Sequence, residues 1–154
     1  MTAAQIIEDP RVITQVRLIL KSFRHWTGRD LLPSSEADSV RRLFEAPFVV
    51  VSHGVQADPI LNYGNASALT LWEMSWEDLI QTPSRLTAES VSQEERTRLL
   101  EQVTQKGFID DYQGVRISKT GRRFRIEKAI VWNLKDEEGR YAGQAATFDR
   151  WRYL

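Results

Sequence analysis

The sequence contains no cysteine. This absence excludes disulfide frameworks, cysteine-based zinc sites, iron–sulfur clusters, thiol nucleophiles and flavin photochemistry that proceeds through a cysteinyl adduct. Histidine is also scarce, since His25 and His53 are the two copies in 154 residues. A histidine-built metal site would need carboxylates to complete it, and we predict none. A lone histidine beside a glycine, as at His53, argues against haem ligation.

The sequence also lacks an excess of either charge. Lysine plus arginine number 21, as do aspartate plus glutamate, so the formal net charge is zero. Proteins that neutralise phosphates usually carry a basic excess, so we expect no nucleic-acid partner. No segment approaches 18 apolar residues, and the N-terminus lacks the features of a signal peptide. We therefore expect a soluble cytoplasmic protein that does not bind membranes.

An amphipathic helix is predicted within residues 1–27. Asp9 and Pro10 form a typical helix start, and Gly28 is a plausible stop. Between them runs one apolar stripe, which either packs in the core or pairs with a second copy of the chain. The candidate dimer-interface residues on this stripe are Val12, Val16, Ile19 and Phe23.

The remaining elements suggest an α+β protein. Residues 28–46 are expected to hold a linker and a short helix over 37–45. Residues 47–154 are expected to form the main domain. Strands are predicted at 48–51, 60–63, 108–118, 122–134 and 141–148, with helices at 65–74, 75–80 and 93–106. These elements predict a five-stranded antiparallel sheet with short helices on one face.

Within the strand predicted at 122–134, the apolar residues alternate onto one face. Those residues are Phe124, Ile126, Ile130, Trp132 and Leu134. Lys128 shares their parity, so it either points into the core region or marks a bulge.

This order of elements resembles a PAS domain, as does the segment from Tyr63 to Leu69. More closely, several short segments resemble the MEKHLA domain family, a PAS-related group found in bacterial proteins and at the C-termini of plant homeodomain-zipper transcription factors. Those segments are residues 47–54, 63–65, 74–76, 83–86 and 143–146. The resemblance covers nearly the whole chain and implies a PAS-like fold, a bacterial single-domain member and a sensory or regulatory role.

A PAS-like fold implies a largely apolar pocket between the sheet and its short helices. Gln144 lies in a strand of small residues that leave room beside it, and Ser84 and Arg85 follow Pro83 in the helical region. Arg85 could hold a carboxylate or a phosphate, or could tie a loop to the sheet. The candidate pocket residues are Tyr63, Asn65, Trp72, Ser84, Arg85, Phe124, Lys128, Trp132 and Gln144. Flavin-binding PAS relatives use a comparable glutamine, so the resemblance leaves non-covalent flavin binding open.

Three functional hypotheses follow. The first is a non-catalytic, PAS-like sensory module that binds a small molecule, a signalling protein or both, and that forms a homodimer. The second is a small cone-shaped α+β enzyme, isomerase- or hydrolase-like, which would show a raised carboxylate pKa in an enclosed pocket. The third is a ligand-free interaction scaffold whose pocket is filled by its own aromatic side chains. The sequence contains no P-loop, dinucleotide, zincin or nucleophile-elbow motif. We therefore favour the first.

Overall fold

The computed structural model describes residues 1–33 and 38–154, except the side chains of residues 90–93. The helices are α1 (Ala3–Glu8), α2 (Pro10–Thr27), α3 (Ser39–Phe44), α4 (Ala66–Trp72), α5 (Trp76–Leu79), the 3₁₀ helix η1 (Ser84–Thr87) and α6 (Ser90–Lys106). The strands are β1 (Val49–His53), β2 (Leu61–Gly64), β3 (Phe108–Ile117), β4 (Arg123–Lys135), β5 (Tyr141–Phe148) and β6 (Arg150–Tyr153). The predicted α+β class is confirmed. The predicted start of the short helix at Ala37 lies outside the described residues.

Local sequence signals set the bounds of α2. The Asp9 side chain accepts a hydrogen bond from the backbone N–H of Arg11 at 2.9 Å, and Pro10 occupies the first turn. The helix ends at Gly28, which adopts the left-handed conformation with φ of 73°. The amphipathic helix is therefore confirmed. The short helix α1, closed by a capping box between Thr2 and Gln5, was not predicted.

All strand pairs in the sheet are antiparallel, in the order β2–β1–β5–β4–β3, and β6 pairs with β4 as a sixth strand. The prediction of five strands missed β6. Strand β5 pairs with the second half of β4, from Ile130 onward. After Asp149 the chain continues as β6 along the first half of β4, where Glu127 pairs with Arg150. One long strand, β4, therefore carries two consecutive partners on the same edge.

A kink at Lys128 reverses the alternation of side chains along β4. Lys128 has φ of 52°, a conformation that side-chain-bearing residues seldom adopt, and its side chain is exposed. Ile126 before the kink and Ala129 after it pack in the same cluster as Trp72. Trp132 instead packs with α2 on the opposite face. The prediction that all the apolar residues of β4 share one face is therefore wrong, because a bulge inserts an extra residue into the two-residue repeat.

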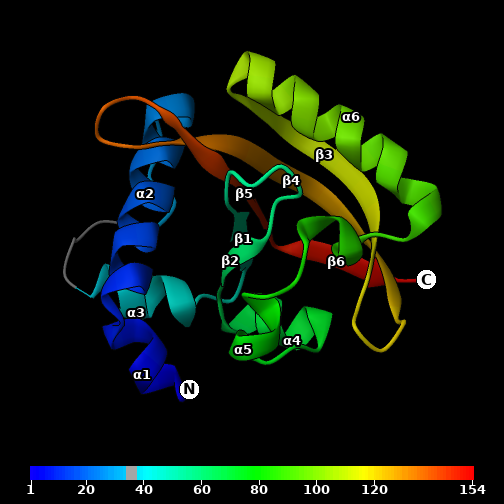
Figure 1. Cartoon of the computed structure of the whole chain (residues 1–154), viewed down its shortest axis with the longest axis horizontal. Coiled ribbons are helices and arrows are strands. Elements are labelled where there is room, and N and C mark those ends of the chain that lie inside the picture. The colour runs from blue at the N-terminus through cyan, green and yellow to red at the C-terminus, as the bar shows by residue number, and fades with distance from the viewer. Residues whose placement is uncertain (34–37) are drawn as a thin grey trace.

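Helices cover both faces of the sheet. Figure 1 shows α2 on one side of the sheet and α6 over β3 on the other. Val131 on β4 packs against Leu99 and Val103 of α6, whereas its neighbour Trp132 packs against Phe23 of α2. We call the face under α2 the outer face and the face under α4, η1 and α6 the inner face.

The apolar stripe of α2 is used inside the chain itself. Its residues Val12, Val16, Ile19 and Phe23 are between 0% and 4% exposed. Phe23 meets Trp132 edge to face, with ring centroids 5.0 Å apart. Of the two roles predicted for the stripe, core packing is the one found, and these four residues are corrected as dimer-interface candidates because they are buried within the chain.

Candidate functional site: a cavity on the inner face

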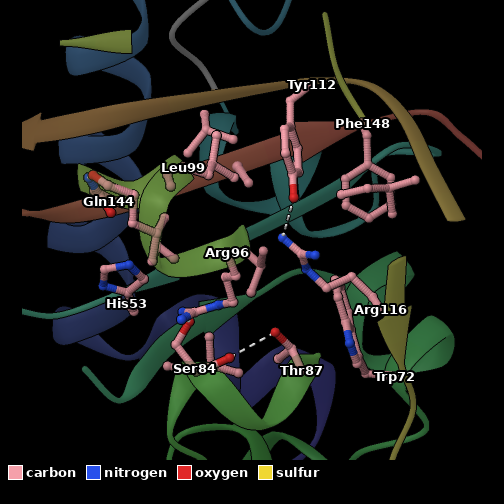
Figure 2. Close-up of a pocket in the computed structure, with 18 residues that line it drawn as sticks. His53, Trp72, Ser84, Thr87, Arg96, Leu99, Tyr112, Arg116, Gln144 and Phe148 are labelled. Carbon is pink, nitrogen blue, oxygen red and sulfur yellow. Dashed lines mark hydrogen bonds between the residues drawn. The ribbon is translucent and has the colours of Figure 1, made fainter. Parts of the chain in front are cut away.

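A cavity of about 60 Å³ lies between the inner face of the sheet and the helices that cover it. Most of its wall is apolar and includes Val51, Leu61, Trp72, Leu99, Ile126, Val131, Ala146 and Phe148. Polar residues also line it, namely Ser52, His53, Ser84, Thr87, Arg96, Tyr112, Arg116 and Gln144. Figure 2 shows Arg96 in the middle of this group, with His53 and Gln144 on one side and Arg116 on the other. An apolar wall with a few convergent polar groups is typical of small-molecule sites.

Gly143 allows β5 to approach β1 closely at the edge of this cavity. Its φ is 117°, and a Cβ atom at this position would lie 2.1 Å from the backbone oxygen of His53. Glycine is therefore required both by the backbone conformation and by the lack of space. The close approach places Gln144 directly opposite His53 in the strand pair.

Gln144 ties α6 to the sheet. Its Nε2 lies within hydrogen-bond distance of the Leu100 carbonyl at 3.0 Å, Thr104 Oγ1 at 3.1 Å and Asn133 Oδ1 at 3.0 Å. The side chain is 2% exposed. Since its amide N–H groups already have partners in the chain, Gln144 shapes the cavity wall and positions α6.

His53 offers an unused acceptor. Its Nδ1 lies 3.0 Å from the carbonyl oxygen of Gly54, which can only accept, so Nδ1 carries the hydrogen. Burial lowers the pKa of His53, which keeps the ring neutral at pH 7. Nε2 is then a lone-pair acceptor that makes no hydrogen bond among the described residues, although the nearby Gln144 side chain offsets a small part of the effect of burial on the pKa of His53.

Two arginines line the same cavity from different elements. Arg96 of α6 donates to Ser84 Oγ, while Arg116 of β3 donates through Nη1 to the Val115 carbonyl at 2.9 Å. The Nη2 atom of Arg116 lies 3.4 Å from the Tyr112 hydroxyl. Burial, together with the charge of Arg116, lowers the pKa of Arg96 to about 10, so it remains protonated at neutral pH.

Three of the nine predicted pocket residues line the cavity, namely Trp72, Ser84 and Gln144. Phe124 lies just behind the wall, edge to face on Trp72 with ring centroids 5.4 Å apart. Tyr63 and Trp132 are fully buried elsewhere, Tyr63 against Trp76 and Trp132 on the outer face. The prediction that these two residues line the pocket is corrected, because both rings pack in the outer layer.

The other three predicted residues also lie away from the cavity. Asn65 is the N-cap of α4, and its side chain bonds four backbone groups. Arg85 is half-exposed and pairs with Asp58, Nε to Oδ2, at 3.2 Å. Lys128 is exposed and lies near Phe23 and Ile130 on the outer side of the sheet. The predicted pocket position of Asn65 is therefore corrected to a structural role, Arg85 has the structural role that the sequence left open, and Lys128 marks the bulge.

Six polar residues of the site were not predicted, namely Ser52, His53, Thr87, Arg96, Tyr112 and Arg116. A signal for Arg96 exists, since it lies three and seven residues before Leu99 and Val103 and thus on the apolar stripe of α6. Arg116 pairs across the sheet with Phe124, a core residue, so correct strand register would have placed it inward.

A flavin does not fit this arrangement of side chains. Pockets for ligands of that size are roughly 300–1,000 Å³, several times the 60 Å³ present. In the described part of the chain, no group of three or more His, Asp or Glu side chains could hold a metal ion. None of the described helices is long and apolar enough to cross a membrane.

The model of the MEKHLA domain matches residues 13–153. The chain belongs to the MEKHLA domain family. Among its relatives are the homeobox-leucine zipper protein HOX29 of Oryza sativa subsp. indica, 24% identical over 135 residues, and ATHB-8 of Arabidopsis thaliana, 27% identical over 135 residues. Both matches cover 84% of this chain and 16% of the relative, so the chain spans about a sixth of their length.

Solved structures show that the MEKHLA domain has the predicted PAS-like fold. A PAS domain from Colwellia psychrerythraea matches with a TM-score of 0.61 and 18% identity, covering 74% of this chain and 92% of that one. The fungal blue-light photoreceptor Vivid, solved as its light-state dimer, matches with a TM-score of 0.59 and 14% identity. That match covers 84% of this chain and 88% of Vivid.

Proposed function

We propose that this MEKHLA domain is the ligand-binding unit of a cytoplasmic, non-catalytic sensor. A small molecule occupies the inner-face cavity, and the occupied state is recognised by a signalling protein. The observation that carries the proposal is that two residues of the cavity wall each hold a buried polar atom that makes no hydrogen bond among the described residues. They are Nε2 of His53, an acceptor, and Nε1 of Trp72, a donor.

Unsatisfied buried polar atoms are uncommon in folded proteins, and each costs about 1–3 kcal/mol. A bound molecule that accepts from Trp72 Nε1, or that donates to His53 Nε2, would recover part of this free energy. The cavity therefore supports a ligand-binding function better than a ligand-free scaffold, in which the aromatic side chains themselves would fill the space.

The geometry gives no support to an enzyme with acid–base carboxylates. No aspartate or glutamate among the described residues lines the cavity. Hydrogen bonds lower the pKa of Asp9, Glu73 and Asp136, and all three carboxylates lie at the surface. An isomerase- or hydrolase-like mechanism needs a carboxylate whose pKa is raised inside the pocket.

The outer layer is the natural output side of this sensor. Residues 47–154 would form the binding unit. The amphipathic helix within residues 1–27 would respond to changes in the sheet on which it packs, and residues 28–46 would connect the two. A homodimer, if it forms, uses a surface other than the buried stripe of α2. The Vivid structure is a light-state dimer, which supports dimerisation as one route for the signal.

Native and denaturing mass spectrometry on one freshly purified sample test the proposal, with an absorption spectrum from the same tube. We expect an extra mass of a small organic compound on the folded protein, and no flavin absorption. Ala146→Leu enlarges a side chain of the cavity wall and so reduces the space for a ligand. Ala142→Leu adds the same atoms elsewhere on β5. The first variant should lose the extra mass, and the second should keep it.

The same two variants also test the proposal if the ligand is lost during purification. A small-molecule library screened by thermal unfolding should then contain compounds that stabilise the wild type and Ala142→Leu but not Ala146→Leu. If no compound distinguishes these proteins and no mass is found, the cavity does not bind ligands and the proposal fails.

A further inference from the structure

Two buried guanidinium groups line the cavity, and neither forms an ion pair with an acidic residue in the part of the chain that the structure describes. Arg96 is 7% exposed and Arg116 is 8% exposed. The ion pairs of the described residues use other side chains throughout, and neither arginine takes part in one. Buried arginines are normally paired, because removing a charge from water is costly.

The two charges also act on each other. The charge of Arg116 helps to lower the pKa of Arg96, after the larger effect of burial. The hydrogen bonds of these groups go to the neutral oxygens of Ser84, Val115 and Tyr112. The described residues thus hold two like charges near one cavity and supply no anion that pairs with them.

Asp58 is an acidic residue whose charge acts on Arg96, but it does not balance the two arginines. Asp58 favours the charged form of Arg96 only as a minor effect, and its carboxylate forms its ion pair with Arg85. That pair is about half-exposed, at the surface rather than in the cavity.

We infer that the ligand is a small organic acid whose carboxylate binds between Arg96 and Arg116, with its apolar part against Leu99, Val131 and Phe148. The inference rests on the proposed function and names its ligand class. Guanidinium groups recognise carboxylates through paired N–H donors. The apolar wall favours an organic acid over a strongly hydrated inorganic anion.

The volume limits the size of this acid. A water-sized group needs about 10–15 Å³, and the cavity has about 60 Å³. It therefore accommodates about four to six non-hydrogen atoms, the size of acetate, propionate or butyrate.

The test compares each of these acids with its primary amide, which has the same shape and no charge. Binding is measured by isothermal titration calorimetry at fixed ionic strength. We expect at least one acid to bind at least about tenfold more tightly than its amide, and Arg116→Gln to weaken that acid about 10- to 100-fold. Arg125→Gln, on the paired strand and away from the cavity, is the matched control and should leave binding unchanged.

A second readout separates a ligand-binding arginine from a structural one. Without ligand, Arg116→Met should unfold at the same temperature as the wild type or a higher one, because it removes an unbalanced buried charge and keeps an apolar stem. A structural arginine would instead lower the unfolding temperature. Arg96→Lys keeps the positive charge but lacks the planar guanidinium group that can donate two parallel hydrogen bonds. It should therefore also weaken binding of the acid, and it replaces Arg116→Gln in the test if that variant does not fold.

Acids that bind no better than their amides would overturn the inference, as would inorganic phosphate that binds while all three acids do not. If the amides bind and Ala146→Leu abolishes that binding, the proposed function stands and the inference on ligand class fails. If neither acids nor amides bind, the inference fails, and mass spectrometry alone decides the proposed function.

Discussion

Replacing Asn65 by alanine should destabilise the protein more than any other single loss of a polar side chain described above. The Asn65 side chain is fully buried. Its Oδ1 accepts from the backbone N–H groups of Val50 and Ala68, both at 3.1 Å. Its Nδ2 donates to the carbonyls of Leu43 at 3.0 Å and Phe48 at 2.8 Å. One side chain thus joins α3, the start of β1 and the start of α4.

The expected loss follows from these four bonds. Each contributes roughly 0.5–1.5 kcal/mol net, so the sum is about 4 kcal/mol, within a range of about 2–6. That is a large share of the roughly 5–15 kcal/mol that stabilises a domain of this size. Ser67→Ala is the matched control, since it removes one bond, at 2.8 Å to the Ala46 carbonyl, and should cost about 1 kcal/mol.

Urea unfolding monitored by tryptophan fluorescence measures both variants, with the slope of the transition checked for two-state behaviour. Asn65→Asp adds a sharper comparison, because a carboxylate keeps the two acceptor contacts but places its charge against two carbonyls. We expect this variant to be at least as unstable as Asn65→Ala. A loss below 1 kcal/mol for Asn65→Ala, or an effect equal to that of Ser67→Ala, would refute the account of Asn65 as the junction of three elements.

Three further predictions follow from backbone, core and protonation. Gly143→Ala should lower the free energy of unfolding by at least about 2 kcal/mol, because the new Cβ would lie 2.1 Å from a backbone oxygen. Gly139→Ala is the control, since its Cβ would meet open space, and it should cost about 1 kcal/mol. Equal losses for the two variants would contradict the steric argument. Phe23→Ala should cost about 3–5 kcal/mol with an unfolding midpoint independent of protein concentration, since the ring is buried within one chain; a midpoint that rises with concentration would point to a dimer instead. Because burial lowers the pKa of His53 below 6.5, the unfolded chain binds a proton more readily, so stability should fall as the pH drops below about 6.5, by up to about 1.4 kcal/mol per pH unit. His53→Gln should remove this slope between pH 5 and 6.5 in denaturant titrations, and the exposed His25→Gln should not.

The elements that could be predicted from the sequence are those set by local signals. The start and end of α2 and the span of β5 follow from caps, glycines and periodicity. The kink at Lys128 follows only in part, because a lysine within the apolar alternation left a bulge as one of two interpretations but did not show that the alternation reverses after it. The sixth strand was missed for a related reason, since β6 exists only because β4 extends past the end of β5.

The candidate site shows the same limit. Gln144 and Trp72 were predicted because small neighbours and the family resemblance mark the strand and helix that carry them. Arg96 and Arg116 were missed because arginine is expected at the surface, and their burial depends on how α6 packs on β3. The pocket position predicted for Trp132 is wrong because the sequence did not show that the bulge at Lys128 turns the following side chains to the other face.

Asn133 links helix α6 to the indole of Trp26 through two hydrogen bonds. Its side-chain Nδ2 donates to the Val103 carbonyl of α6 at 2.9 Å, while its own backbone carbonyl accepts from the indole N–H of Trp26, also at 2.9 Å. One residue of β4 therefore anchors the helix above the cavity and fixes a fluorophore in the layer beneath it. A substitution at Asn133 therefore changes the support of α6 and the surroundings of the Trp26 indole together.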